Sequence, residues 1–110
     1  MDKQLYSEFK KVSYILDHCY FASYNFALGG ILGELSCDLW EDGSPADTAT
    51  YEDLIQIIEG VKEYDSVHKA LFFLETYSAQ TGFDFDSAIA VLKVMSDEQI
   101  AELNCKANCE

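Results

Sequence analysis

Apolar residues recur every three or four positions along most of the 110-residue chain, and this spacing constrains the fold more than any other feature. A period near 3.6 residues places such residues on one face of an α-helix. Alternation of apolar and polar residues, the signature of a strand, extends over three positions only, Asp84 to Asp86. One proline and six glycines are few for the many turns of a β-sandwich or barrel. We therefore predict an all-α fold.

Capping residues and glycines divide the pattern into five or six short helices of about 10–17 residues. Ser96 and Gln99 match a capping box, and Gly82 is well placed to end a helix. Short connections favour a compact bundle or orthogonal array, in a single domain spanning 1–110. The first predicted helix covers 2–19, with an extension to 20–21 as the alternative, and the second covers 23–39. The third begins at a cap formed by Asp47, Thr48 or Thr50 and ends at 64, and the fourth covers 67–80 after a cap at Asp65 or Ser66. The fifth covers 87–95 after a cap at Asp86, and the last covers 97–104, with Cys109 as its alternative end.

Three glycines, Gly29, Gly30 and Gly33, lie inside the predicted 23–39 helix. Each costs up to ~1 kcal/mol relative to alanine, so something must offset them. Either another helix packs closely across a glycine surface, from this chain or from a second copy, or the helix breaks at Gly29-Gly30 and shapes a binding site. The apolar positions assigned to this helix are Phe26, Leu28, Ile31, Leu32, Leu35 and Leu39.

The charge balance excludes whole classes of partner. Seven lysines oppose 20 acidic residues, so the net charge is −13, and the chain has no arginine. Binding to nucleic-acid phosphates or to anionic membranes needs clustered cations, and the chain lacks them. A basic protein is the natural counterpart because complementary charge steers encounter and selects partners. The plainer interpretation is that the acidity only keeps the chain in solution.

The acids concentrate in residues 34–63, which we call the acidic segment. No lysine lies between Lys11 and Lys62. Glu34 and Asp38, with Glu41 or Asp42, have the spacing of one helical face, and Glu52, Glu59 and Glu63 have it on the next helix. Because tyrosine and tryptophan commonly anchor interfaces, we include two aromatic neighbours. The predicted partner-binding residues are Glu34, Asp38, Trp40, Glu41, Asp42, Asp47, Tyr51, Glu52, Glu59 and Glu63.

Alternatives to a docking surface are a solvated acidic face and a divalent-cation site. The segment Asp38 to Ala49 can be compared with a calcium-binding EF-hand loop, and Asp38, Asp42 and Gly43 fit positions one, five and six. Trp40 at its third position and Ala49 at its twelfth do not fit, and the bidentate glutamate is missing. We therefore expect no metal and no cofactor.

Catalytic chemistry has little support in the sequence. His18 and His68 are the only histidines: the neighbours of His18 point in other directions on a helix, and the contact that Asp65 can make with His68 three residues later is a common surface arrangement. Cys105 and Cys109, four residues apart, suit half of a zinc site, a strained disulfide or a frayed tail with free thiols. The chain has no Gly-rich phosphate loop, HExxH motif, nucleophile elbow or CxxC pair. We expect a protein that is not an enzyme.

The remaining features indicate a soluble, cytoplasmic protein. The first 19 residues are charged throughout and lack the apolar region of a signal peptide. The longest apolar stretch, 21–32, is too short to span a bilayer and is interrupted by Ser23 and Asn25. Free thiols are then expected for all four cysteines, with Cys19 and Cys37 as small core residues.

These observations favour a non-catalytic acidic protein that neutralises a basic protein partner. Its most specific form is an immunity protein or antitoxin that inhibits a toxin such as a nuclease. The alternatives are a DNA mimic that acts on a DNA-binding protein, a helical adaptor or homodimeric regulator, and a small enzyme or metal-dependent regulator built on Cys105, Cys109 and a histidine.

Overall fold

The computed structural model describes residues 3–37 and 41–109, and these form six α-helices and no strand. The all-α prediction is therefore confirmed. The helices are α1 (Lys3–Ser23), α2 (Phe26–Leu35), α3 (Thr48–Glu59), α4 (Ser66–Thr81), α5 (Asp86–Lys93) and α6 (Asp97–Asn108).

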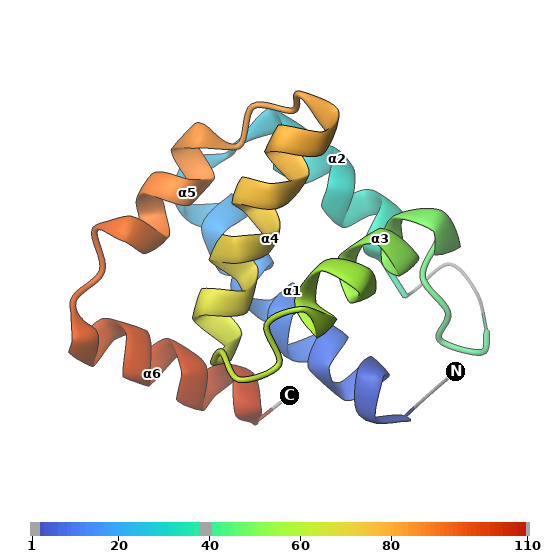
Figure 1. Ribbon diagram of the computed structural model, residues 1–110, viewed down its shortest axis with the longest axis horizontal. Helices are drawn as coiled ribbons and strands as arrows, with labels where there is room; N and C mark the ends of the chain where they lie inside the picture. The colour runs from blue at the N-terminus through green and yellow to red at the C-terminus, as the bar shows by residue number, and fades with distance from the viewer. Residues whose placement is uncertain (1–2, 38–40, 110) are drawn as a thin grey trace.

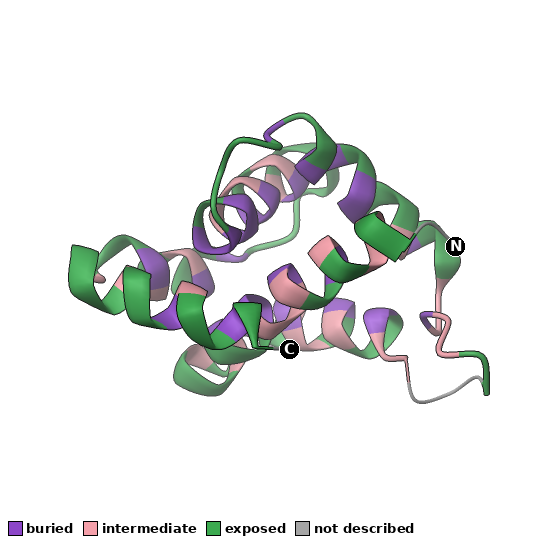
Figure 2. Cartoon of the chain, turned by 90° about the horizontal axis from the view of Figure 1, so that it is seen from below, coloured by how far each residue is buried: buried purple, intermediate pink, exposed green. Residues whose placement is uncertain are grey.

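The longest helix, α1, is the centre of the array and packs against each of the other five (Figure 1). Its apolar residues at positions 9, 12, 15, 16 and 19 are buried, as the helical spacing predicted. They meet buried side chains from α2, α3, α4, α5 and α6 in one hydrophobic core. In Figure 2 the buried positions line the inner sides of the helices and the exposed positions face outward.

Local capping residues set several boundaries as predicted. The Asp47 carboxylate accepts from the backbone N–H of Ala49 at the start of α3, and Asp65 caps α4. Both hydrogen bonds of the capping box form at the start of α6. Gly82 ends α4 with φ of +80°, a left-handed conformation that glycine adopts without steric cost.

Other boundaries differ from the prediction. α2 begins after Asn25, which caps it, and ends at Leu35, although a helix over 23–39 was expected. The returning loop stops it, because Ala46 N–H donates to Ser36 O at 2.8 Å and Asp47 N–H donates to Glu34 O at 2.7 Å. Leu39 lies outside the described residues.

α1 continues to residue 23, α3 ends at Glu59 rather than at 64, and α5 ends at 93 rather than at 95. Asp86 is not the cap of α5; it lies in the first turn, where a carboxylate favours the helix dipole. The buried Phe85 takes the cap position instead. α6 runs to 108, close to the longer alternative.

Candidate functional site

The C-terminal end of α2 and the N-terminal end of α3 bring acidic residues together. Thr50 Oγ1 donates a hydrogen bond of 2.8 Å to Glu34 Oε2, and the Asp47 backbone N–H donates to the Glu34 carbonyl. Asp47 uses its own carboxylate to cap α3. Two predicted site residues that are 13 positions apart therefore lie side by side on a fixed backbone.

A third carboxylate, Asp53 of α3, faces the same region. It accepts a hydrogen bond from Tyr77 Oη of α4 at 3.0 Å. Burial, this hydrogen bond and the negative charges of Asp53, Glu34 and Asp47 together raise the pKa of Tyr77 to about 12. The phenol thus lies within the field of all three carboxylates, which we call the carboxylate cluster (Glu34, Asp47 and Asp53).

Asp53 was not among the predicted site residues. It was one acid among nine in the lysine-free stretch, and nothing local in the sequence pairs it with Tyr77, 24 positions away. Only the packing of α3 on α4 makes that contact.

The other acids of the segment are exposed. Glu41 and Asp42 lie in the loop before α3, Glu52 and Glu59 lie seven residues apart on α3, and Glu63 follows that helix. Asp38 and Trp40 lie outside the described residues.

The loop that carries Glu41 and Asp42 is held in place. Tyr6 Oη of α1 donates to the Gly43 carbonyl at 3.2 Å, and the loop's Pro45 is fully buried. Hydrogen bonds from Ser44, including its backbone N–H to Asp42 Oδ1, lower the pKa of Asp42. The loop therefore presents ionised carboxylates on an anchored backbone.

One part of the predicted site is wrong, and a second part differs in its surroundings from an exposed side chain. The continuous helical faces do not form, because α2 ends at Leu35 before Glu41 and Asp42, and α3 ends at Glu59 before Glu63. Tyr51 is half-buried, and its ring packs edge-to-face on Phe9 with centroids 4.8 Å apart. Part of its surface is therefore used in packing against the core, and its role in partner binding stays a prediction.

Four lysines form ion pairs in the described residues, each with an acid outside the acidic segment, and one further lysine, Lys62, lies within that segment. Lys11 and Lys69 both pair with Glu8, and the other lysine pairs are Lys93–Glu75 and Lys106–Glu102. Over the ranges 3–37 and 41–109, no acid from Glu34 to Glu63 has a lysine or histidine nitrogen within the 4.0 Å of an ion pair. The negative charge of this region is therefore uncompensated by direct contacts.

The most exposed aromatic residues are ones that the sequence did not single out. Phe21, Tyr24 and Phe26 all lie at the turn between α1 and α2. Phe26 was assigned to the apolar face of its helix, but 95% of its surface is exposed. No signal in the sequence separates it from a core phenylalanine such as Phe9, because the 3.6-residue period fits both.

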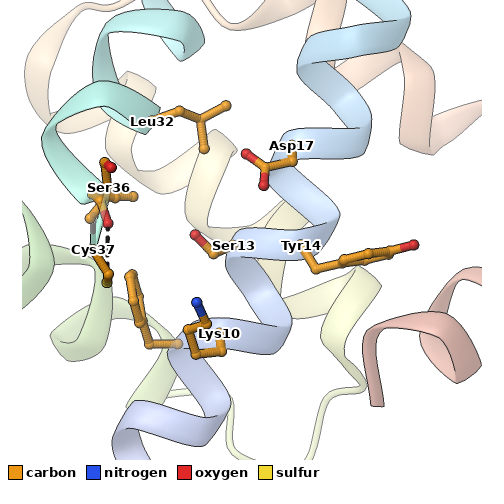
Figure 3. Close-up of a pocket in the computed structure, with 9 residues that line it drawn as sticks. Lys10, Ser13, Tyr14, Asp17, Leu32, Ser36 and Cys37 are labelled. Carbon is orange, nitrogen blue, oxygen red and sulfur yellow. Dashed lines mark hydrogen bonds between the residues drawn. The ribbon is translucent and has the colours of Figure 1, made fainter. Parts of the chain in front are cut away.

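A pocket of about 270 Å³ lies between α1 and the C-terminal end of α2 (Figure 3). In Figure 3 the Tyr14 ring points to the far side of α1, away from Cys37. Small-molecule sites are usually larger, about 300–1,000 Å³, and mostly apolar. This pocket carries both Lys10 and Asp17, so it does not resemble such a site. Its lining residues are Phe9, Lys10, Ser13, Tyr14, Asp17, Leu32, Leu35, Ser36 and Cys37.

The residues considered for metal or redox chemistry lie apart or at the surface. Cys105 and Cys109 are exposed free thiols, whereas Cys19 is buried. His68 is exposed, and its Nδ1 lies 2.8 Å from Asp65 Oδ1 within the same helix start. Among the described residues, no three His, Cys, Asp or Glu side chains gather as metal ligands would.

The comparisons with other proteins assign no relative. The chain matches no protein-family model, no curated protein and no solved structure. In the described ranges, no helix is both long enough and apolar enough to cross a membrane.

Proposed function

We propose that this chain is a non-catalytic binding protein that neutralises a basic protein partner through the acids of α2, α3 and the loop between them. The observation that carries this proposal is the uncompensated charge of the region. Asp53 contacts Tyr77, Glu34 and Asp47 act on the same phenol through their charges, and exposed acids continue along α3, without an ion pair among the described residues. Such a surface attracts a basic partner and speeds its encounter.

The positions of the charges support the same proposal. Glu34 is held by Thr50, Asp47 by its role as a cap and Asp53 by Tyr77. A partner would therefore meet carboxylates that are already ordered, which lowers the entropy lost on binding.

In its most specific form, the partner is a toxin such as a nuclease, and this chain is its immunity protein or antitoxin. A nuclease binds the phosphates of its substrate through basic side chains, so its active site offers the complementary charge. Occupation of that site by carboxylates would block substrate without any catalytic group on this chain.

The test begins with affinity capture from the source organism's lysate at low and at high salt. The captured basic protein is then titrated against two variants of equal net charge. In the first, Glu41, Glu52, Glu59 and Glu63 become glutamine. In the control, exposed acids on α4 and α6 are neutralised instead (Glu75→Gln, Asp97→Asn, Glu98→Gln and Glu102→Gln).

We expect the first variant to weaken binding by at least about 10-fold and the control by less than about 3-fold, since contacts matter more than total charge. Equal losses in the two variants would contradict the proposed surface. Binding that survives high salt unchanged would contradict the electrostatic basis of the proposal. If the partner is a nuclease, inhibition of its activity by wild type tests the specific form.

A further inference from the structure

Three large aromatic side chains stand out from the surface where α1 turns into α2. Phe21, Tyr24 and Phe26 are 69%, 73% and 95% exposed. Tyr20 joins two of them, because its ring lies 5.6 Å from that of Phe21 and 5.9 Å from that of Tyr24 between centroids. We call Phe21, Tyr24 and Phe26 the aromatic corner. Exposed apolar clusters of this kind commonly mark interaction sites.

The backbone under the aromatic corner is strongly constrained. Tyr24 has φ of +51°, which is uncommon for a residue other than glycine. The Asn25 side chain is hydrogen-bonded on both sides: Nδ2 donates to Asp84 O at 3.1 Å and to Ser87 Oγ at 2.8 Å, and Oδ1 accepts from Leu28 N–H at 2.9 Å. The aromatic rings therefore project from a fixed turn, which suits a preorganised contact surface.

The exposed side of α2 continues this surface. Phe26, Gly30 and Gly33 are spaced four and three residues apart, so they share one helix face, and all three are exposed. A Cβ built on Gly29 would lie 2.8 Å from the Tyr20 ring, so close packing inside the chain accounts for that glycine. A Cβ on Gly30 or Gly33 would meet nothing within 4 Å. Each of these two glycines costs the helix up to ~1 kcal/mol relative to alanine, and no close packing within the described chain offsets that cost.

Carboxylates border this surface. Asp84 and Asp86 are both exposed, and the Asp84 carbonyl accepts a hydrogen bond from Asn25 of the turn, so these two residues lie beside it. A second copy of the chain would add another −13 of charge and meet like with like. A basic segment would meet opposite charge, and arginine also stacks on aromatic rings.

We propose that the aromatic corner and the Gly30–Gly33 face of α2 form a second contact surface, which receives an amphipathic basic helix of a protein partner. The apolar side of that helix packs on Phe26 and the two glycines, and its cations pair with Asp84 and Asp86. That the partner is positively charged depends on the function proposed above. The location of the surface on the molecule is inferred independently of that function.

The test uses two synthetic 18-residue peptides of leucine, alanine and arginine with identical composition. One places its leucines on a single helical face, and the other has the same residues scrambled. Binding is mapped by backbone amide chemical shifts of the full chain, and affinities are measured by calorimetry. The variants are Phe26→Ser, which removes the exposed ring, and Gly30→Gln, which covers the face while improving helix propensity. The matched control is Val94→Ser, since Val94 is 80% exposed at the end of α5.

We expect the amphipathic peptide to shift residues 21–33 and 84–87 and to bind about 10-fold more tightly than the scrambled peptide. Phe26→Ser and Gly30→Gln should each weaken it by about 5- to 10-fold, and Val94→Ser by less than 2-fold, in line with the dominance of central aromatic contacts.

Three results would overturn the inference. Shifts confined to residues 41–63, with Phe26→Ser and Gly30→Gln binding as wild type does, would refute this surface and leave the acidic segment as the binding site. No binding of either peptide, while the captured basic protein of the function test still binds, would overturn this surface and leave the proposed function standing. A dimer in sedimentation that dissociates in Phe26→Ser or Gly30→Gln would assign the surface to a second copy instead.

Discussion

The Tyr77 hydroxyl of α4 donates a hydrogen bond of 3.0 Å to the Asp53 carboxylate of α3, and this contact connects the acidic segment to the core. The Tyr77 ring also stacks on the buried Phe73, with centroids 5.0 Å apart. One side chain thus joins an apolar core contact to a surface carboxylate.

The pKa of Tyr77, about 12, predicts a specific alkaline behaviour. Because the folded value lies above the ordinary value of 10.0, the phenol stabilises the fold fully below pH 10 and loses that contribution as the pH rises toward 12. Urea unfolding at pH 7 and at pH 11 should show a larger alkaline loss in wild type than in Tyr77→Phe. Parallel losses in the two proteins would show that Tyr77 does not carry the effect.

Glu8 of α1 holds the buried Lys69 of α4 through a contact of 2.7 Å. Glu8→Gln should lower the free energy of unfolding at pH 7 by about 2 kcal/mol, since a buried ammonium loses its charged partner. Glu102→Gln, which breaks an exposed pair with Lys106, is the control and should cost under about 0.5 kcal/mol. Chemical unfolding of both variants checks the difference.

The same carboxylate predicts acid sensitivity. Burial raises the pKa of Glu8, but the hydrogen bond and charge of Lys69 and the charge of Lys11 outweigh it, so the net pKa lies below 4.5. The stabilisation is then present above pH 4.5 and is lost as the pH falls through the lower folded value. Wild type and Glu8→Gln should therefore converge in stability in acid. A gap that stays constant down to pH 2 would contradict this origin.

The four thiols should differ in reactivity. Burial raises the pKa of Cys19 to about 12, whereas Cys105 and Cys109 are exposed. A thiol-reactive disulfide reagent at pH 8 should label Cys105 and Cys109 first, the half-buried Cys37 more slowly, and Cys19 only on unfolding. Mass spectrometry of the labelled sites measures the order. Labelling of native Cys19 at the rate of Cys105 would mean that the core opens readily.

Two exposed glycines should respond oppositely to alanine. Gly82 has φ of +80°, so Gly82→Ala should destabilise the fold by about 1 kcal/mol. Gly30 lies in a regular helix with open space around it, so Gly30→Ala should stabilise by up to ~1 kcal/mol. Thermal unfolding of the pair compares them directly. Destabilisation by Gly30→Ala would mean that this face is already covered.

The sequence predicts those features of the fold that depend on neighbouring residues. Asp47, Asp65 and the Ser96–Gln99 box act on backbone groups two or three positions away, so their residue types suffice. The end of α2 could not be predicted, because it depends on hydrogen bonds from a loop that returns to the helix. Ala46 donates to the carbonyl of Ser36, 10 positions earlier, and Asp47 to that of Glu34, 13 positions earlier.

In the candidate site, too, the features that depend on nearby residues could be predicted and those that depend on tertiary packing could not. The concentration of acids was visible in the sequence, but the meeting of Asp53 with Tyr77 depends on how α3 packs against α4. The exposure of Phe26 also depends on tertiary structure, since its apolar character alone favours burial.

Asn25 has one further consequence, which concerns synthesis on the ribosome. Its amide binds Asp84 and Ser87, residues 59 and 62 positions later, so a nascent chain lacks the partners that fix the turn before α2. These two hydrogen bonds can form only after residues 84–87 have been synthesised, whereas the bonds within residues 20–28 can form before them. A partner that binds the turn with these hydrogen bonds formed would therefore bind the full-length chain in preference to a nascent one.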